Sequence, residues 1–176
     1  MSLLDRLGLA ASLAVGALFG VRLDESIRVE RAVGVIEHRD TTGRLLNRQV
    51  VRNVKTNGGI DFNHTQSYSQ AAQALGLTYI ALSNDTVTET ATSTTLTNEI
   101  VANGLSRAVG SFSHTAATTT STIGKTFTCA TAPQAAQKAA LFSAGAAGTM
   151  HHVLAFTQRS LQIGDTLAVT FTITVS

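Results

Sequence analysis

Apolar and polar residues alternate most strictly near the C-terminal end of the chain, after the turn-forming pair Gly164-Asp165. A period of two places successive side chains on opposite faces of a strand, so this stretch predicts a strand with one core face and one uncharged face. The predicted core face carries Leu167, Val169, Phe171, Ile173 and Val175, and the opposite face carries Ala168, Thr170, Thr172 and Thr174. A face covered with threonine is also suited to packing against a neighbouring subunit.

A second alternating stretch begins after Arg22 and predicts a long, charged β-hairpin. Asp40-Thr41-Thr42-Gly43 supplies the turn, and the residues from Arg44 to Lys55 form the returning arm. The first arm is expected to place Ile27, Val29, Val33 and Val35 on one face, with Arg28 and Glu30 on the other. In the second arm, every fourth position is an arginine, which places three guanidinium groups on one side of the strand: Arg44, Arg48 and Arg52.

The middle of the chain has the pattern of short strands separated by turn residues. Asn57-Gly58-Gly59 is expected to end the hairpin, and Gln66 to Leu75, rich in Gln and Ala, predicts a short helix. Further strands are predicted over Tyr79–Leu82, Gly104–His114 and Ile123–Ala130, with a threonine-rich strand or loop over Asn84–Thr97. The helical crossovers of a parallel sheet are missing, so the expected fold class is all-β, an antiparallel β-sandwich of Ig-like or jelly-roll-like type.

The segment from Leu7 to Val21 contains no charged residue. It is shorter than the ~20 residues of a membrane-spanning helix, and Asp5 beside Arg6 removes the positive bias that precedes the core of a signal peptide. An apolar helix that packs on protein is therefore favoured, with a signal peptide and membrane insertion as alternatives. The expected organisation is an anchoring helix over residues 1–22, a charged hairpin arm over 23–58 and a β-sandwich body over 59–176.

Composition indicates a protein that associates with others. The chain has 176 residues, of which 14% are charged and 44% hydrophobic. Soluble domains usually carry about 25% charged residues, so a surface this poor in charge favours assembly. The net charge is only +2, and the single cysteine excludes an internal disulfide framework. Basic residues gather between Arg22 and Lys55, but acidic residues are interleaved and aromatic partners are missing, which disfavours nucleic acid as a ligand.

Residues that carry chemistry are scattered along the chain. His38, His64 and His114 are far apart, and His151-His152 would point to opposite faces of a strand, so no metal site is expected. Cys129 lies in an apolar alternating context that indicates a buried, inert thiol. Three carboxylates that could serve in acid–base catalysis are expected in solvated loops: Asp85, Glu89 and Glu99. The sequence therefore predicts no enzyme, cofactor or small-molecule substrate.

The order of several short segments resembles a family of small structural proteins of tailed bacteriophages. These segments are Val51–Ile60, Tyr79–Thr86 leading through Thr95–Glu99, Ala139–Ala144 with Gly148–Met150, and Gly164–Leu167. The resemblance covers about Val33 to Ser176, and Ser83–Thr86 departs from the Gly-Thr-Gly-Thr turn that is frequent in the family. It implies a virion protein associated with the tail or fibre, with copies of itself and other virion proteins as partners.

These observations favour a non-enzymatic subunit of a phage particle, assembled on the tail. Capsid decoration, a host-receptor or glycan-binding module, and a secreted or cell-surface protein remain open alternatives. The hypothesis assigns orientation by charge to Arg44, Arg48 and Arg52. The main contact is assigned to five apolar side chains of the N-terminal segment: Leu3, Leu7, Leu13, Leu18 and Phe19.

Overall fold

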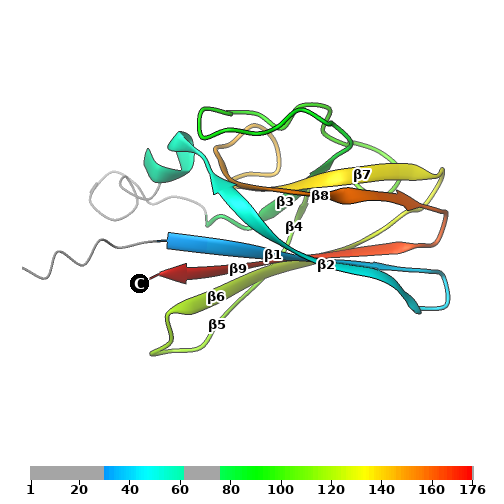
Figure 1. Cartoon of the computed structure of the whole chain (residues 1–176), viewed down its shortest axis with the longest axis horizontal. Helices are drawn as coiled ribbons and strands as arrows, with labels where there is room; N and C mark the ends of the chain where they lie inside the picture. The colour runs from blue at the N-terminus through cyan, green and yellow to red at the C-terminus, as the bar shows by residue number, and fades with distance from the viewer. Residues whose placement is uncertain (1–29, 62–75, 176) are drawn as a thin grey trace, which may run out of the picture. The chain divides into compact units, whose positions relative to one another are not determined.

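A computed structural model describes residues 30–61 and 76–175 of the chain, and these residues contain nine strands in one antiparallel sheet (Figure 1). The order of the strands in the sheet is β4-β3-β7-β8-β2-β1-β9-β6-β5. The all-β, antiparallel class is thereby confirmed. The strands are β1 (Glu30–Arg39), β2 (Leu45–Lys55), β3 (Tyr79–Ser83), β4 (Ala108–Val109), β5 (Ser111–His114), β6 (Thr120–Thr128), β7 (Gln134–Phe142), β8 (Met150–Leu161) and β9 (Thr166–Val175).

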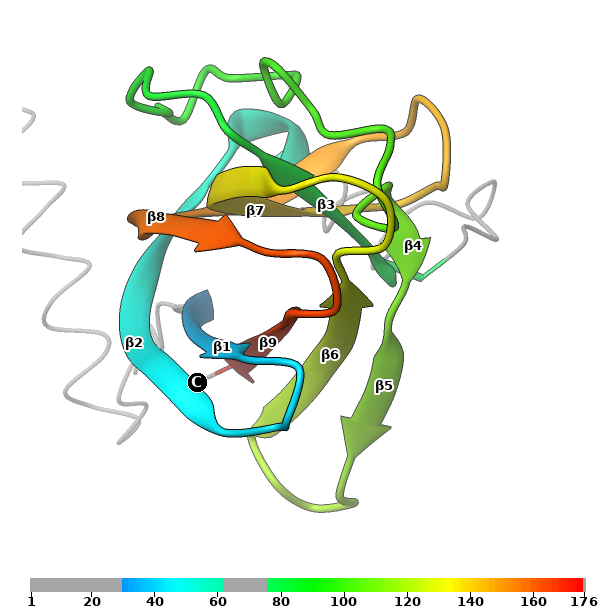
Figure 2. The ribbon, with the colours of Figure 1, turned by 90° about the vertical axis from the view of Figure 1, so that its right-hand side faces the viewer.

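The sheet curls until its two ends nearly meet, as Figure 2 shows from one end. The end strands β4 and β5 are separated only by Gly110, whose N–H donates to the Thr78 carbonyl. On the opposite side, β2 pairs with both β1 and β8 and so joins the two halves. The expected division into two facing sheets is therefore not confirmed. The enclosed core is built mainly from large apolar side chains, among them Ile36, Ile80, Phe127, Leu154 and Phe171.

The predicted hairpin is present, and Val33 and Val35 share one face of its first arm, as predicted. Val33 and Val35 lie on the outer face of β1, whereas Ile36 is fully buried on the inner face. Gly34, also on the inner side, lies so close to Leu154 that a Cβ there would be 2.0 Å from its Cδ1. Small residues on the inner side of β1 leave room for large side chains of β8, so the size of the apolar residues did not mark the core face.

The hairpin is also part of the main sheet, because β1 pairs along its length with β9. In β9 the predicted alternation is confirmed: Leu167, Val169 and Phe171 are fully buried, and Ala168 and Thr170 between them are partly exposed. The strand β2 ends at Lys55, before the expected break, and residues 57–61 are helical. The Thr56 hydroxyl accepts from the Gly59 N–H and caps this helical segment.

Both faces of β3, β7 and β8 are covered. Ile80 and Leu141 face the enclosed core, whereas Tyr79, Ala140 and Phe142 form a second cluster on the outer side with Leu96 of the segment 84–107. The sequence pattern predicts no strand over β7 or β8. A strand covered on both faces does not show the alternation by which half-buried strands are recognised.

The predicted helices over residues 1–22 and 66–75 lie outside the described residues. Within the residues that the structure describes, no helix has the length and apolar character to cross a membrane.

Candidate interaction surface

The outer face of the β1–β2 hairpin presents aliphatic and arginine side chains side by side. In the antiparallel register, Val33 lies opposite Arg52 and Val35 lies opposite Val50. Val33, Val50 and Val54 are 36%, 55% and 37% exposed. These residues, with Arg48 and Arg52, are called the hairpin face below. Exposed valines on a regular sheet next to arginines are typical of protein–protein contact surfaces.

The three arginines singled out from the sequence are all exposed. Arg48 and Arg52 share the outer face of β2, as predicted, and Arg44 lies in the turn before the strand. The Nε atoms of Arg44 and Arg48 lie 3.1 Å from Asp40 Oδ2 and 3.3 Å from Glu37 Oε1. Among the described residues Arg52 has no ion-pair partner, which leaves its charge available to a partner protein.

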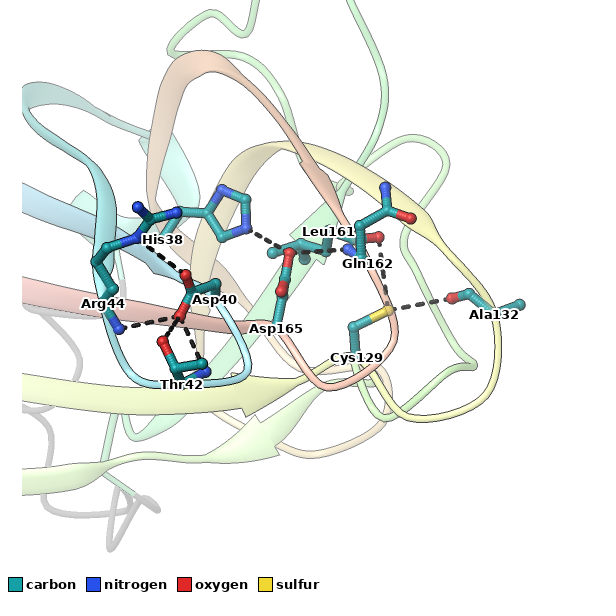
Figure 3. A network of polar contacts seen from close by, with 9 residues as sticks. All are labelled: His38, Asp40, Thr42, Arg44, Cys129, Ala132, Leu161, Gln162 and Asp165. Carbon is teal, nitrogen blue, oxygen red and sulfur yellow. Dashed lines mark hydrogen bonds and ion pairs between the residues drawn. The ribbon is translucent and has the colours of Figure 1, made fainter.

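Asp40 fixes the turn of the hairpin, as Figure 3 shows. Its Oδ1 accepts hydrogen bonds from the Thr42 hydroxyl at 2.6 Å and from the main-chain N–H groups of Thr42 and Arg44. The hydrogen bond from Thr42 is the main reason why the pKa of Asp40 falls to about 2. The turn therefore holds a fixed negative charge beside Arg44.

The five apolar residues of the proposed contact, Leu3, Leu7, Leu13, Leu18 and Phe19, lie outside the described residues. Of the residues expected to form the interface, the structure therefore describes only the three arginines.

A buried polar group lies at the same end of the sheet as the hairpin turn. His38 Nε2 lies 2.9 Å from Asp165 Oδ2, which also accepts from the Gln162 N–H (Figure 3). Nearby, the buried Cys129 thiol donates to the carbonyl of Ala132. Burial raises the pKa of Cys129, which disfavours the reactive thiolate. The His38–Asp165 pair was not predicted from the sequence, although the position of His38 two residues after Ile36 places both side chains on the same face of β1.

The carboxylates Asp85 and Glu89 are not solvated, contrary to the expectation from their threonine-rich surroundings. Lys138 of β7, 2% exposed, donates from Nζ to Asp85 Oδ2 at 3.0 Å, to Glu89 Oε1 at 2.9 Å and to the Val87 carbonyl. The hydrogen bond from Lys138 lowers the pKa of Asp85. Burial opposes the charge of Lys138, but its bonds to Glu89 and Asp85 outweigh burial and raise its pKa. The Lys138 cluster therefore favours the charged forms of Lys138 and Asp85.

Glu99 is likewise paired, with Nε and Nη2 of Arg107.

The two adjacent histidines of β8, His151 and His152, do not point to opposite faces. Both are fully buried, and their ring centroids are 4.3 Å apart. The register of β7 and β8 shifts between Leu141 and Phe142, and this irregularity breaks the alternation on which the expectation rested. No three His, Cys, Asp or Glu side chains in the described part of the chain form a group that could hold a metal ion.

A shallow depression of about 480 Å³ lies over the segment that follows β3. Its lining is mostly polar: Asn84, Asn98, Glu99, Ile100, Val101, Ala102 and Gln134. The Glu99 carboxylate in it is already bound to Arg107, so the depression presents amide groups and main chain rather than an acid–base pair.

Comparisons of the chain with protein-family models, curated proteins and solved structures found no match in any of the three.

Proposed function

We propose that this protein is a non-enzymatic structural subunit of a tailed-phage virion, an accessory protein assembled on the tail. The observation that carries the proposal is the hairpin face, where exposed valines lie beside Arg48 and Arg52 on a regular sheet. Such a surface fits contact with protein better than contact with water. In this proposal the two halves of the curled sheet act as the layers of an Ig-like or jelly-roll-like sandwich.

The paired state of the carboxylates supports a structural role. Asp85, Glu89, Glu99 and Asp165 each bind a lysine, arginine or histidine of the same chain. Carboxylates held in internal ion pairs position segments of the chain, and general acid–base catalysis requires groups poised to exchange protons with a substrate.

The hairpin face alone is too small to anchor a subunit. Burying a whole valine side chain contributes about 1.5–3 kcal/mol, and the three valines are only about half exposed, so the face contributes roughly 3 kcal/mol before ordering costs. The five apolar residues of segment 1–22 would contribute on the order of 10 kcal/mol by the same reasoning. The proposal therefore assigns anchoring to that segment and orientation to the arginines.

The test is the copy number of the protein in purified particles, measured by quantitative mass spectrometry. Full-length protein is expected in every particle, and a variant lacking residues 1–21 is expected to be lost from it. A truncated protein incorporated at the normal copy number would refute the anchor, and absence of the full-length chain would refute the virion role. Copies on the order of hundreds would indicate capsid decoration instead of the tail.

The amide-lined depression favours a second candidate, a receptor- or glycan-binding module. Asn84, Asn98 and Gln134 offer donors and acceptors of the kind that sugar hydroxyls use. A glycan array probed with the full chain would decide this point: binding that is lost on Asn98→Ala supports the module, and an array without hits dismisses it.

A further inference from the structure

Arg159 of β8 is a buried cation without a counter-charge in the described part of the chain. The residue is 6% exposed, and its Nη2 donates to Gln49 Oε1 at 2.9 Å. Its Nε has no hydrogen-bond partner among the described residues. Burial alone accounts for a lowered pKa of Arg159. A buried guanidinium is costly unless a carboxylate or comparable acceptor pairs with it, so this arrangement is incomplete as it stands.

Arg107 of the same chain shows how a guanidinium is paired with a carboxylate. Its Nε lies 2.9 Å from Glu99 Oε1, and its Nη2 lies 2.5 Å from Glu99 Oε2. This side-on pair of parallel bonds is a strong and geometrically specific way to hold a carboxylate. Arg159 offers the same two donors, of which one is bound by a neutral amide oxygen and the other by nothing in the described residues.

Near Arg159 the strand β8 is not paired with β2. β2 pairs with β8 only from Asn53 to Lys55, so its residues 45–52 have β1 as their one strand partner among the described residues. Figures 1 and 2 show β2 and β8 diverging toward the end that carries the hairpin turn. The Gln49 side chain bridges the strands there, because its Oε1 also accepts from the Thr157 N–H at 2.9 Å. A strand edge without a partner is a site where an extended segment can add.

The charge around this edge is positive. Arg48 and Arg52 lie on β2 and Arg44 lies in the turn before it, and the nearby carboxylates Glu37 and Asp40 are already engaged by arginines. An acidic segment is therefore the complementary partner.

We propose that β2 and β8 form a binding site for an extended acidic segment of a partner protein, which adds to the edge of β2 and places an Asp or Glu carboxylate on Nε and Nη2 of Arg159. The carboxylate replaces Gln49 on Nη2, and Gln49 keeps its bond to Thr157. This inference rests on the proposed function, because it names the chemistry of the partner in the particle.

The test uses the full chain and two synthetic peptides, acetyl-Thr-Val-Glu-Val-Thr-amide and its glutamine analogue. Binding is followed by NMR through the Nε–Hε signal of Arg159. The glutamate peptide is expected to shift this signal and to bind about tenfold more tightly than the glutamine peptide, equivalent to about 1.4 kcal/mol. Arg159→Gln should abolish the difference between peptides, whereas Lys125→Gln on β6 should retain it.

Three results would overturn the proposal. The first is equal affinity for the two peptides, or no shift at millimolar concentration. The second is an equal shift with inorganic phosphate and no preference for glutamate, which would indicate a general anion site. The third is a change in the Nε–Hε signal of Arg159, without any peptide, when Asp24→Asn and Glu25→Gln are introduced. This would mean that a carboxylate of the same chain occupies the site.

A stability measurement separates binding from a structural role. Because Arg159 lacks a carboxylate partner, Arg159→Met is expected to leave the melting temperature unchanged or raised. A melting temperature lowered by several degrees would show that the fold needs this charge, and would also overturn the proposal. Normal incorporation of wild-type protein into particles with failure of the peptide test would leave the proposed function standing without this site.

Discussion

Asp40 closes the β1–β2 hairpin through the Thr42 hydroxyl and two main-chain N–H groups. Each of these bonds is made to the charged carboxylate, so the folded chain resists protonation at this position. The pKa of Asp40 is lowered to about 2, below its ordinary value of 3.8. The stabilisation by this group is complete above about pH 4 and is lost as the pH falls through 2.

The Thr42 hydroxyl is the strongest of these influences, which gives a direct prediction. Thr42→Val keeps the shape of the side chain but removes the donor, so the pKa of Asp40 should rise toward 3.8. The carboxyl carbon signal of Asp40, followed by NMR between pH 6 and 1.5, measures this shift. Thr41→Val is the matched control and should leave the titration unchanged. An Asp40 midpoint near 3.8 in the wild type would contradict the turn geometry.

Gly59 illustrates a second constraint, the close approach of two main chains. A Cβ at Gly59 would lie 2.7 Å from the His151 carbonyl oxygen, whereas at Gly58 the nearest atom would be a methyl group of Thr149 at 3.2 Å. Gly59→Ala is therefore expected to destabilise the protein by about 1–3 kcal/mol through forced main-chain shifts. Gly58→Ala should be near neutral, since Ala favours a helix over Gly. Urea unfolding of both variants tests this, and equal effects would refute it.

At this scale the sequence indicated residue types better than their partners. The turn at Asp40–Gly43 was predictable because Asp and Gly favour turns by their own geometry. The pairs His38–Asp165 and Lys138–Asp85 join residues more than fifty positions apart, and no local pattern determines such contacts. The burial of Arg159 could not be predicted from the sequence. Its position without a carboxylate partner depends on where β2 and β8 diverge, which no local pattern determines.

Among the elements, the segment 84–107 contains no named strand and is held by a few main-chain hydrogen bonds together with side-chain contacts. Ser83 donates to the Thr97 carbonyl, the Ile100 N–H donates to the Leu82 carbonyl, and the Lys138 cluster holds the segment near Val87. Leu96 covers the outer face of the sheet from this segment. The threonine-rich stretch thus covers the sheet and is attached by ion pairs, hydrogen bonds and the apolar contact of Leu96.

Breaking the Lys138 cluster should loosen this cover. Lys138→Met leaves Asp85 and Glu89 without their shared cation, so local opening becomes easier. A decrease of 1.4 kcal/mol in the opening free energy accelerates proteolysis about tenfold, and cleavage within residues 86–97 is expected to rise by at least that factor. The triple variant Lys138→Met, Asp85→Asn, Glu89→Gln removes every charge and should restore much of the protection. Identical cleavage of wild type and Lys138→Met would contradict the assignment.

Local propensity also explains which elements were found from the sequence. β9 alternates because one of its faces is buried, and its prediction was correct for that reason. β7 contains Gln134-Ala135-Ala136-Gln137-Lys138-Ala139-Ala140, a composition that favours helix in isolation, yet it pairs with β3 and β8. Tertiary pairing outweighed local preference there. The inner side of β1 is also set by tertiary contact, since a Cβ at Gly34 would clash with the Leu154 side chain.

For the described residues as a whole, the curled sheet leaves few strand edges in solution. β4 and β5 meet at Gly110, and β2 bridges the two halves, so strand edges without a partner include β5 and the facing stretches 45–52 of β2 and 155–161 of β8. Closure of this kind limits nonspecific edge pairing. Two places suited to specific association are the hairpin face and the adjacent edge of β2.

Self-association provides a test of the hairpin face that is independent of the phage particle. If copies of this chain contact one another there, Val50→Asp buries a charge in the contact and should weaken association by about tenfold or more, about 1.4 kcal/mol. Ile163→Asp is the matched control, because Ile163 is 53% exposed but lies in the β8–β9 turn. Sedimentation velocity over a range of concentrations measures both variants. Equal weakening by the two substitutions, or a wild type that stays monomeric at the highest concentration, would remove self-contact from the hairpin face and leave other virion proteins as its partners.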